Sequence, residues 1–296
     1  MLGKLLKYEI KATGRIFLPL YLGLMVVSVL ASFTLQSDNW IINLLSGLLL
    51  GALYCALIVV TIALLIQRFY TNLLKDEGYL MFTLPVTPSI LITSKLIATC
   101  MWCVLSLVIG AAAGLIVSWG FNGMEEIMSE LHAAFPDFSL SAIPALVIIL
   151  FFTAALSQII FGILQIYFSL AVGQLPPFGR FKILAAVVTY LVTSFVVQFA
   201  AMAVFMAFGV YYAIRFESII NLEKTVDSSY IGIINSPDGS MQLMIADESA
   251  RILSSMPEVW TLLNEFFAYA AAFNLVFAAA AFVGTSLILK KKLNLE

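Results

Sequence analysis

The residues that could do chemistry in this chain are few and scattered. The sequence has one histidine, His132, and three cysteines, Cys55, Cys100 and Cys103. Zinc needs three or four nitrogen, sulfur or oxygen ligands, which a lone histidine beside acidic residues does not supply. Cys100 and Cys103 have C-x-x-C spacing, but they lie in an apolar stretch without a second pair, which favours packing over metal or redox use. We therefore expect no catalytic site, no metal and no cofactor.

Nucleotide and nucleic-acid chemistry is not expected either. The sequence contains no G-x-x-x-x-G-K-[ST] phosphate loop. Its formal net charge of −2 and isoelectric point near 5.5 provide no basic field for nucleic-acid phosphates. If the chain depends on ATP, we expect the hydrolysis in a separate subunit.

The composition indicates the environment of the fold. Of the 296 residues, 62% are hydrophobic and 11% are charged, and the mean hydropathy is +1.05. Soluble domains average about 45–50% apolar and about 25% charged residues. Because only lipid can cover so much apolar surface, we predict an all-α integral membrane protein.

Long apolar runs separated by polar breaks predict six transmembrane helices. Each run has the roughly 20 residues that a helix needs to cross a bilayer. The runs lie near 16–36, 41–66, 90–118, 142–172, 183–210 and 264–289. They form a transmembrane domain over 16–289, which residues 1–15 precede and a basic tail, 290–296, follows.

The basic residues predict that both termini are cytoplasmic. With the N-terminus inside, 12 of the 15 lysines and arginines lie on the inner side, whereas 13 of the 17 acidic residues lie outside. Basic flanks of short loops are retained in the cytoplasm. The longest outer segment, 211–263, falls between spans five and six, and the acidic outer side slightly favours cationic molecules through its field.

We expect the interiors of the predicted spans to carry no ionisable side chain. A proton-driven carrier would need an embedded acid or histidine, so the driving force is expected from elsewhere. The most notable polar residues are Gln158 and Gln165, which are seven apart and share one helix face. They line a pathway or hydrogen-bond to a neighbouring helix, and the second is the commoner use of such amides.

Residues 1–15 predict an amphipathic helix in the membrane interface. At about 100° per residue, its basic residues share one face and its leucines the other. Glu9 is the exception, because it falls on the apolar face, where an unpaired carboxylate is unfavourable. We expect Glu9 to be paired with a partner protein, with the loop after the second span, or with a nearby lysine of its own helix.

The predicted cytoplasmic loop 67–89 contains the strongest candidate for a contact with another protein. An acidic pair is followed by Gly78, which can end a helix, and by an exposed apolar run, 79–82. Large apolar residues on the cytoplasmic side suit a groove on a partner. Alternatively, Tyr79 and Phe82 anchor the loop at the membrane interface.

Two segments resemble the type-2 ATP-binding-cassette (ABC) permeases of Gram-positive bacteria. They are residues 1–11, MLGKLLKYEIK, and residues 76–86, DEGYLMFTLPV, together with Lys95. The six-span layout with a large outer segment before the last span is similar over essentially the whole chain.

The resemblance implies a permease subunit of an exporter in the plasma membrane, without catalysis of its own. It would pair with a second permease copy, as a homodimer or heterodimer, and recruit a cytosolic ABC ATPase. Its cargo would be a hydrophobic or amphipathic solute such as a lipid, drug or peptide. The residues expected to contact the ATPase are Glu9, Asp76, Glu77, Gly78, Tyr79 and Phe82, and the candidate pathway-lining residues are Gln158 and Gln165.

Two other functions remain open at this point. The first is a non-transporting membrane assembly or accessory protein that binds a cytosolic partner through the same loop. The second is an ion-coupled carrier that works without an ATPase, which the uncharged spans disfavour.

Overall fold

The fold is a set of long α-helices. The computed structural model describes residues 2–34, 39–71, 87–120, 129, 143–178, 181–227 and 257–291. Within these residues the elements are all helical. They are α1 (Leu2–Thr34), α2 (Trp40–Phe69), α4 (Pro88–Gly120), α6 (Ala145–Gly173), the short 3-10 helix η3 (Pro176–Phe178), α7 (Lys182–Asp227) and α9 (Pro257–Lys291).

Six of the helices are long and apolar enough to cross a membrane. Their spanning stretches have 29 to 31 residues and mean hydropathies from 2.0 to 2.8. The predicted all-helical architecture with six membrane-length helices is therefore confirmed for the described part of the chain, as expected of a multi-pass membrane protein. The orientation, with both termini cytoplasmic, stays a prediction.

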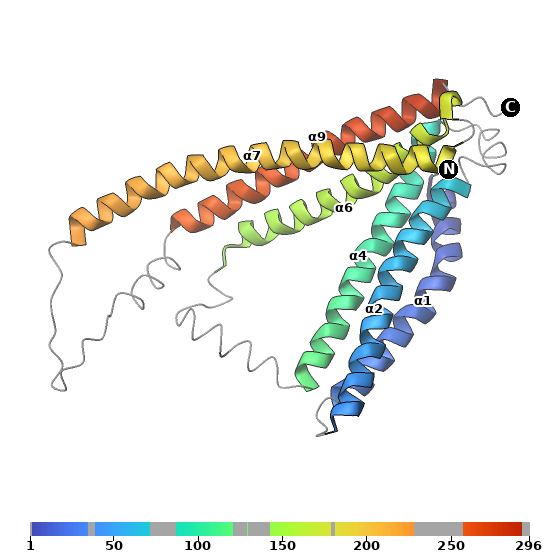
Figure 1. Ribbon diagram of the computed structural model, residues 1–296, viewed down its shortest axis with the longest axis horizontal. Coiled ribbons are helices and arrows are strands. Elements are labelled where there is room, and N and C mark those ends of the chain that lie inside the picture. The colour runs from blue at the N-terminus through green and yellow to red at the C-terminus, as the bar shows by residue number, and fades with distance from the viewer. Residues whose placement is uncertain are drawn as a thin grey trace.

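The helices form two groups of three that diverge from a common end (Figure 1). In one group α1 packs along α4 and α2, and in the other α6 packs along α9 and α7. The groups touch mainly through α6, which contacts α4 and α2, and through α9, which contacts α4. The start of α1 and the end of α9 lie at the end where the groups meet (Figure 1).

Two buried clusters hold this arrangement together. One lies within the first group and includes Phe17, Tyr21 and Trp102. The other draws on both groups and includes Phe69 of α2 and Tyr167 of α6, which are both fully buried. Their rings stack with centroids 4.0 Å apart and an interplanar angle of 12°. This stacked pair lies at the contact between the two groups.

Two glycines allow close helix approach in the second group. A Cβ at Gly173 would lie 2.5 Å from the backbone oxygen of Lys182, so only glycine fits where α6 ends beside the start of α7. A Cβ at Gly284 of α9 would lie 2.7 Å from the ring of Phe168 of α6. These contacts keep α7 and α9 close against α6.

The helix boundaries differ from the predicted ones at two places. The predicted interfacial helix, 1–15, and the first span form one unbroken helix, α1, and its position relative to the membrane stays a prediction. α7 continues to Asp227, so the predicted extracellular segment 211–263 begins as a helix. Residues 228–256 of that segment and residues 72–86 of the predicted cytoplasmic loop lie outside the described residues.

Candidate functional site

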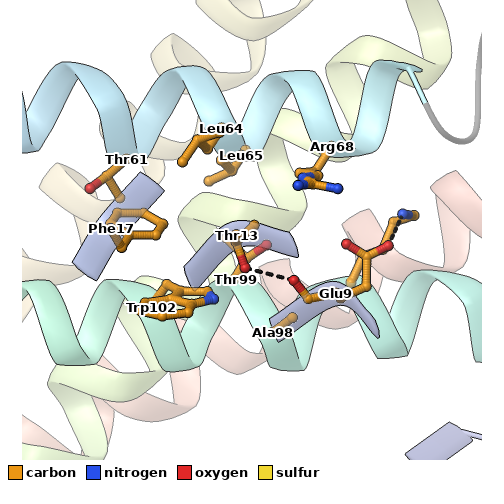
Figure 2. A pocket seen from close by; sticks show the side chains of 11 residues that line it. Glu9, Thr13, Phe17, Thr61, Leu64, Leu65, Arg68, Ala98, Thr99 and Trp102 are labelled. Atoms are coloured by element: carbon orange, nitrogen blue, oxygen red, sulfur yellow. Dashed lines mark hydrogen bonds and ion pairs between the residues drawn. The ribbon is translucent and has the colours of Figure 1, made fainter. Parts of the chain in front are cut away.

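A small pocket with both apolar and polar lining residues lies where α1, α2 and α4 meet. Its walls combine apolar side chains with charged ones and hydroxyls (Figure 2). We call it the α1–α2–α4 pocket. Its polar lining residues are Glu9, Thr13, Thr61, Arg68, Lys95 and Thr99, and the indole of Trp102 completes one wall.

A buried ion pair joins α1 to α4 at this pocket. Lys95 Nζ lies 2.7 Å from Glu9 Oε1, and the two side chains are 3% and 12% exposed. Thr13 donates a hydrogen bond of 2.7 Å to the backbone oxygen of Glu9 and lies one turn further along α1. Because each charge would be unfavourable alone in this position, the pair fixes the register of α1 on α4.

Glu9 is therefore paired, as expected. The three expected partners were another protein, the loop after the second span and a lysine of the same helix. Its partner is Lys95, 86 residues away, which follows the second span as the second alternative has it but lies within α4 and not in a loop. The contact of Glu9 with an ATPase stays a prediction.

Arg68 brings a second positive charge to the pocket. It is half-buried in the last turn of α2 and reaches toward the turn of α1 that carries Glu9 (Figure 2). No carboxylate among the described residues forms an ion pair with it. Among the described lining residues the pocket thus holds two cations and one carboxylate.

Trp102 contributes a buried donor to the same pocket. Its ring stacks on Phe17 with centroids 4.8 Å apart, and the residue is only 6% exposed. Its indole nitrogen has no hydrogen-bond acceptor in the described part of the chain. The space open to the centre of a water molecule amounts to about 20 Å³, which is enough for one or two waters but not for a cargo molecule.

One helical turn connects the ion pair to the second group of helices. Thr99 follows Lys95 by one turn of α4, and its hydroxyl lies 3.1 Å from the hydroxyl of Tyr167 on α6. Tyr167 in turn stacks on Phe69 of α2. A continuous series of contacts therefore runs from the first turns of α1 through α4 to the place where the two groups meet.

The two predicted glutamines have different surroundings. Gln165 is buried, and its amide donates a hydrogen bond of 2.7 Å to the hydroxyl of Ser194 on α7. Gln158 is exposed on α6. No hydrogen bond between described residues links the two amides, and a pathway-lining role stays a prediction for both.

The remaining predicted site residues cannot be placed. They lie outside the described residues and are Asp76, Glu77, Gly78, Tyr79 and Phe82.

The expectation of uncharged spans is wrong. Glu9, Lys95 and Glu265 all fall in the apolar stretches of membrane-length helices. Glu9 and Lys95 neutralise each other, and Glu265 accepts a hydrogen bond from the hydroxyl of Tyr212. Partners of this kind make a charge tolerable in an apolar setting, and they come from distant parts of the chain, so single-helix patterns do not show them.

Sequence reasoning also missed Arg68, Lys95 and Trp102 as neighbours of Glu9. One signal was present: a carboxylate on an apolar helix face requires a cation, and Lys95 is a lysine inside a predicted span. No protein-family model, no curated protein and no solved structure matches this chain.

Proposed function

We propose that this chain is the membrane-spanning permease subunit of an ATP-driven exporter in a bacterial plasma membrane, and that a separate cytosolic subunit hydrolyses the ATP. The observation that carries the proposal is the series of buried contacts from α1 to both helix groups. Glu9 and Lys95 join α1 to α4, and Thr99 and Tyr167 join α4 to α6. The resemblance of residues 1–11 and 76–86 to type-2 ABC permeases supports the same function.

The proposed mechanism starts at the N-terminal turns of α1. A cytosolic ATPase that closes on ATP would press on these turns and on the loop 67–89. A shift of α1 carries α4 with it, because separating Glu9 from Lys95 would leave two buried charges. The shift then changes the contact of Thr99 with Tyr167 and the angle between the two helix groups. ATP and cargo would each favour one of the two arrangements, which couples their binding.

The proposed partners follow from the same interpretation. The ATPase would contact the N-terminal turns of α1, which carry Glu9, and the segment 76–82, and a second permease copy would complete the membrane part. Replacement of Tyr79 or Phe82 by aspartate is expected to abolish co-purification of the ATPase, because a charge does not enter an apolar groove. Co-purification that survives both replacements would remove this contact from the proposal.

Reconstitution with the cytosolic ATPase that co-purifies with the chain tests the function. Proteoliposomes are assayed for ATP-dependent movement of rhodamine 6G, a hydrophobic cation, and of a fluorescently labelled phospholipid. We expect ATP-dependent movement of at least one probe. Binding of the ATPase without movement of either probe would support the accessory protein, and movement driven by an ion gradient without ATPase would support the carrier.

The Lys95→Met variant tests the mechanism separately. It removes the charge while keeping the length of the side chain, so we expect the ATPase to remain bound and transport to fall at least tenfold. Thr153→Val is the matched control, because Thr153 is exposed on α6 and bonds only to the backbone of its own helix. Unchanged transport in Lys95→Met would refute coupling through the ion pair.

A further inference from the structure

A second hollow lies between α7 and α9, in the parts of these helices that are remote from the chain termini (Figure 1). Its volume is about 530 Å³, within the range of about 300–1,000 Å³ typical of small-molecule sites. Four of the six residues that line it are aromatic and one is a carboxylate. They are Phe208, Tyr211 and Tyr212 of α7, and Glu265, Ala268 and Tyr269 of α9.

The aromatic rings face in different directions. Phe208 lies 5.6 Å from Tyr269 with an interplanar angle of 74°, and 4.3 Å from Tyr212 with an angle of 52°. Tyr211 and Tyr212 meet nearly at right angles, at 85°. The four rings therefore line one space at several orientations, and aromatic rings attract cations within about 6 Å of their faces.

Glu265 supplies the negative charge of the hollow. The hydroxyl of Tyr212 donates a hydrogen bond to its carboxylate, and Tyr212 is only 7% exposed, so the acceptor is held in place. Among the residues whose side chains the structure describes, no lysine or arginine lines this hollow and none forms an ion pair with Glu265. A carboxylate in the apolar part of a membrane-length helix is unfavourable without a positive partner.

We propose that this aromatic and carboxylate site binds an organic cation, namely a substituted ammonium group with an apolar body. The rings match the weakly hydrated ammonium, and Glu265 balances its charge. A metal ion fits poorly, because hard cations need about six oxygen ligands and the hollow offers one carboxylate. A neutral apolar ligand would leave the charge of Glu265 without a positive counterpart.

A membrane-interface belt is the competing explanation of the aromatic residues, since tyrosine is common at that depth. A belt accounts for exposed rings, but it requires neither a hollow nor a carboxylate held by a buried tyrosine. The predicted orientation puts this end of α7 and α9 on the acidic outer side, whose field would concentrate cations. Binding of the cation does not depend on the proposed function. Only the idea that the bound cation is also the exported cargo rests on it.

Binding of choline to the purified full-length chain in maltoside detergent, without any ATPase, tests the proposal. The comparison ligand is 3,3-dimethylbutan-1-ol, which has the same shape as choline but no charge. We expect choline to bind about tenfold more tightly, by calorimetry or by ligand-observed NMR. Equal binding of the two ligands, or no binding of either, would overturn the proposal.

Variants assign the binding to this hollow. Glu265→Gln keeps an oxygen acceptor for Tyr212 but removes the charge, and we expect it to abolish the preference for choline. Tyr269→Leu is expected to weaken choline binding about fivefold, whereas Tyr269→Phe keeps the ring and the affinity. Tyr190→Leu, at an exposed tyrosine of α7 outside the hollow, is the control. A preference for choline that survives Glu265→Gln would overturn the assignment.

The two proposals can fail independently. Loss of choline binding in these variants with intact ATP-dependent movement of the phospholipid would leave the permease without this cation site. Choline binding in a chain that moves no probe would leave the site without transport.

Discussion

The Glu9–Lys95 pair gives the sharpest prediction about stability. At 2.7 Å, two opposite charges attract by about 6 kcal/mol at an effective dielectric constant of about 20. Most of this attraction offsets the desolvation of two nearly buried side chains. Removal of one charge by Lys95→Met leaves the Glu9 carboxylate buried without its partner, and we expect the free energy of unfolding to fall by about 3–5 kcal/mol.

The double variant separates the pair from its parts. Glu9→Gln removes the other charge, and with Lys95→Met it leaves two neutral side chains of similar size. Because paired buried charges are often no more stabilising than well-packed neutral groups, we expect the double variant to lie within about 1 kcal/mol of the wild type. The two single changes are thus expected to be strongly non-additive.

Equilibrium unfolding in mixed micelles, followed by tryptophan fluorescence, measures all four proteins. Thr153→Val serves as the control for a substitution on an exposed helix face. Single variants within about 0.5 kcal/mol of the wild type would refute the burial argument. Additive effects in the double variant would show that the two side chains do not depend on each other.

Four further substitutions test the packing by the same unfolding measurement. Trp102→Phe keeps the stacked ring and removes the buried indole donor, so we expect the free energy of unfolding to stay the same or to rise by about 1 kcal/mol. A fall of more than about 2 kcal/mol would show that the indole nitrogen has a hydrogen-bond partner. Tyr167→Phe keeps the ring stacked on Phe69 of α2 and removes the hydroxyl contact with Thr99 of α4, so we expect the free energy of unfolding to fall by about 1 kcal/mol. An unchanged free energy of unfolding would show that this contact does not help to join the two helix groups. Gly173→Ala puts a methyl group 2.5 Å from a backbone oxygen, and we expect it to lower the free energy of unfolding by about 1–3 kcal/mol. At Gly209 an added methyl group meets nothing within 4 Å, so we expect Gly209→Ala to raise the free energy of unfolding by about 0.5–1 kcal/mol. Equal effects at the two glycines would contradict the close approach of α6 and α7.

The helices could be predicted because their cause is local. Six apolar runs each exceed the thickness of a bilayer, and each of them became a helix. The end of α7 could not be predicted in this way, because hydropathy marks where lipid ends and not where the helix ends. Residues 211–227 lack the apolar pattern of the span, but they continue the same α-helix.

The site was only half predictable, because its partners come from different helices. The position of Glu9 on an apolar face indicated that it needs a partner. The identity of Lys95 depends on the register of α1 against α4, which no pattern within one helix specifies. The same holds for Gln165 with Ser194 and for the aromatic residues that surround Glu265. In all three cases the packing of the helices determines which residue becomes the partner.

The meeting of the two helix groups at one end gives the molecule the mechanics of a lever. From Tyr167 to the far end of α6 the helix rises through 22 residues, or about 33 Å. A tilt of about 10° at the tyrosine would sweep the opposite tip through about 6 Å, roughly the width of a lipid chain or of a small organic cation. A displacement no larger than one hydrogen-bond contact near the termini would therefore be amplified into an opening of molecular size at the other end.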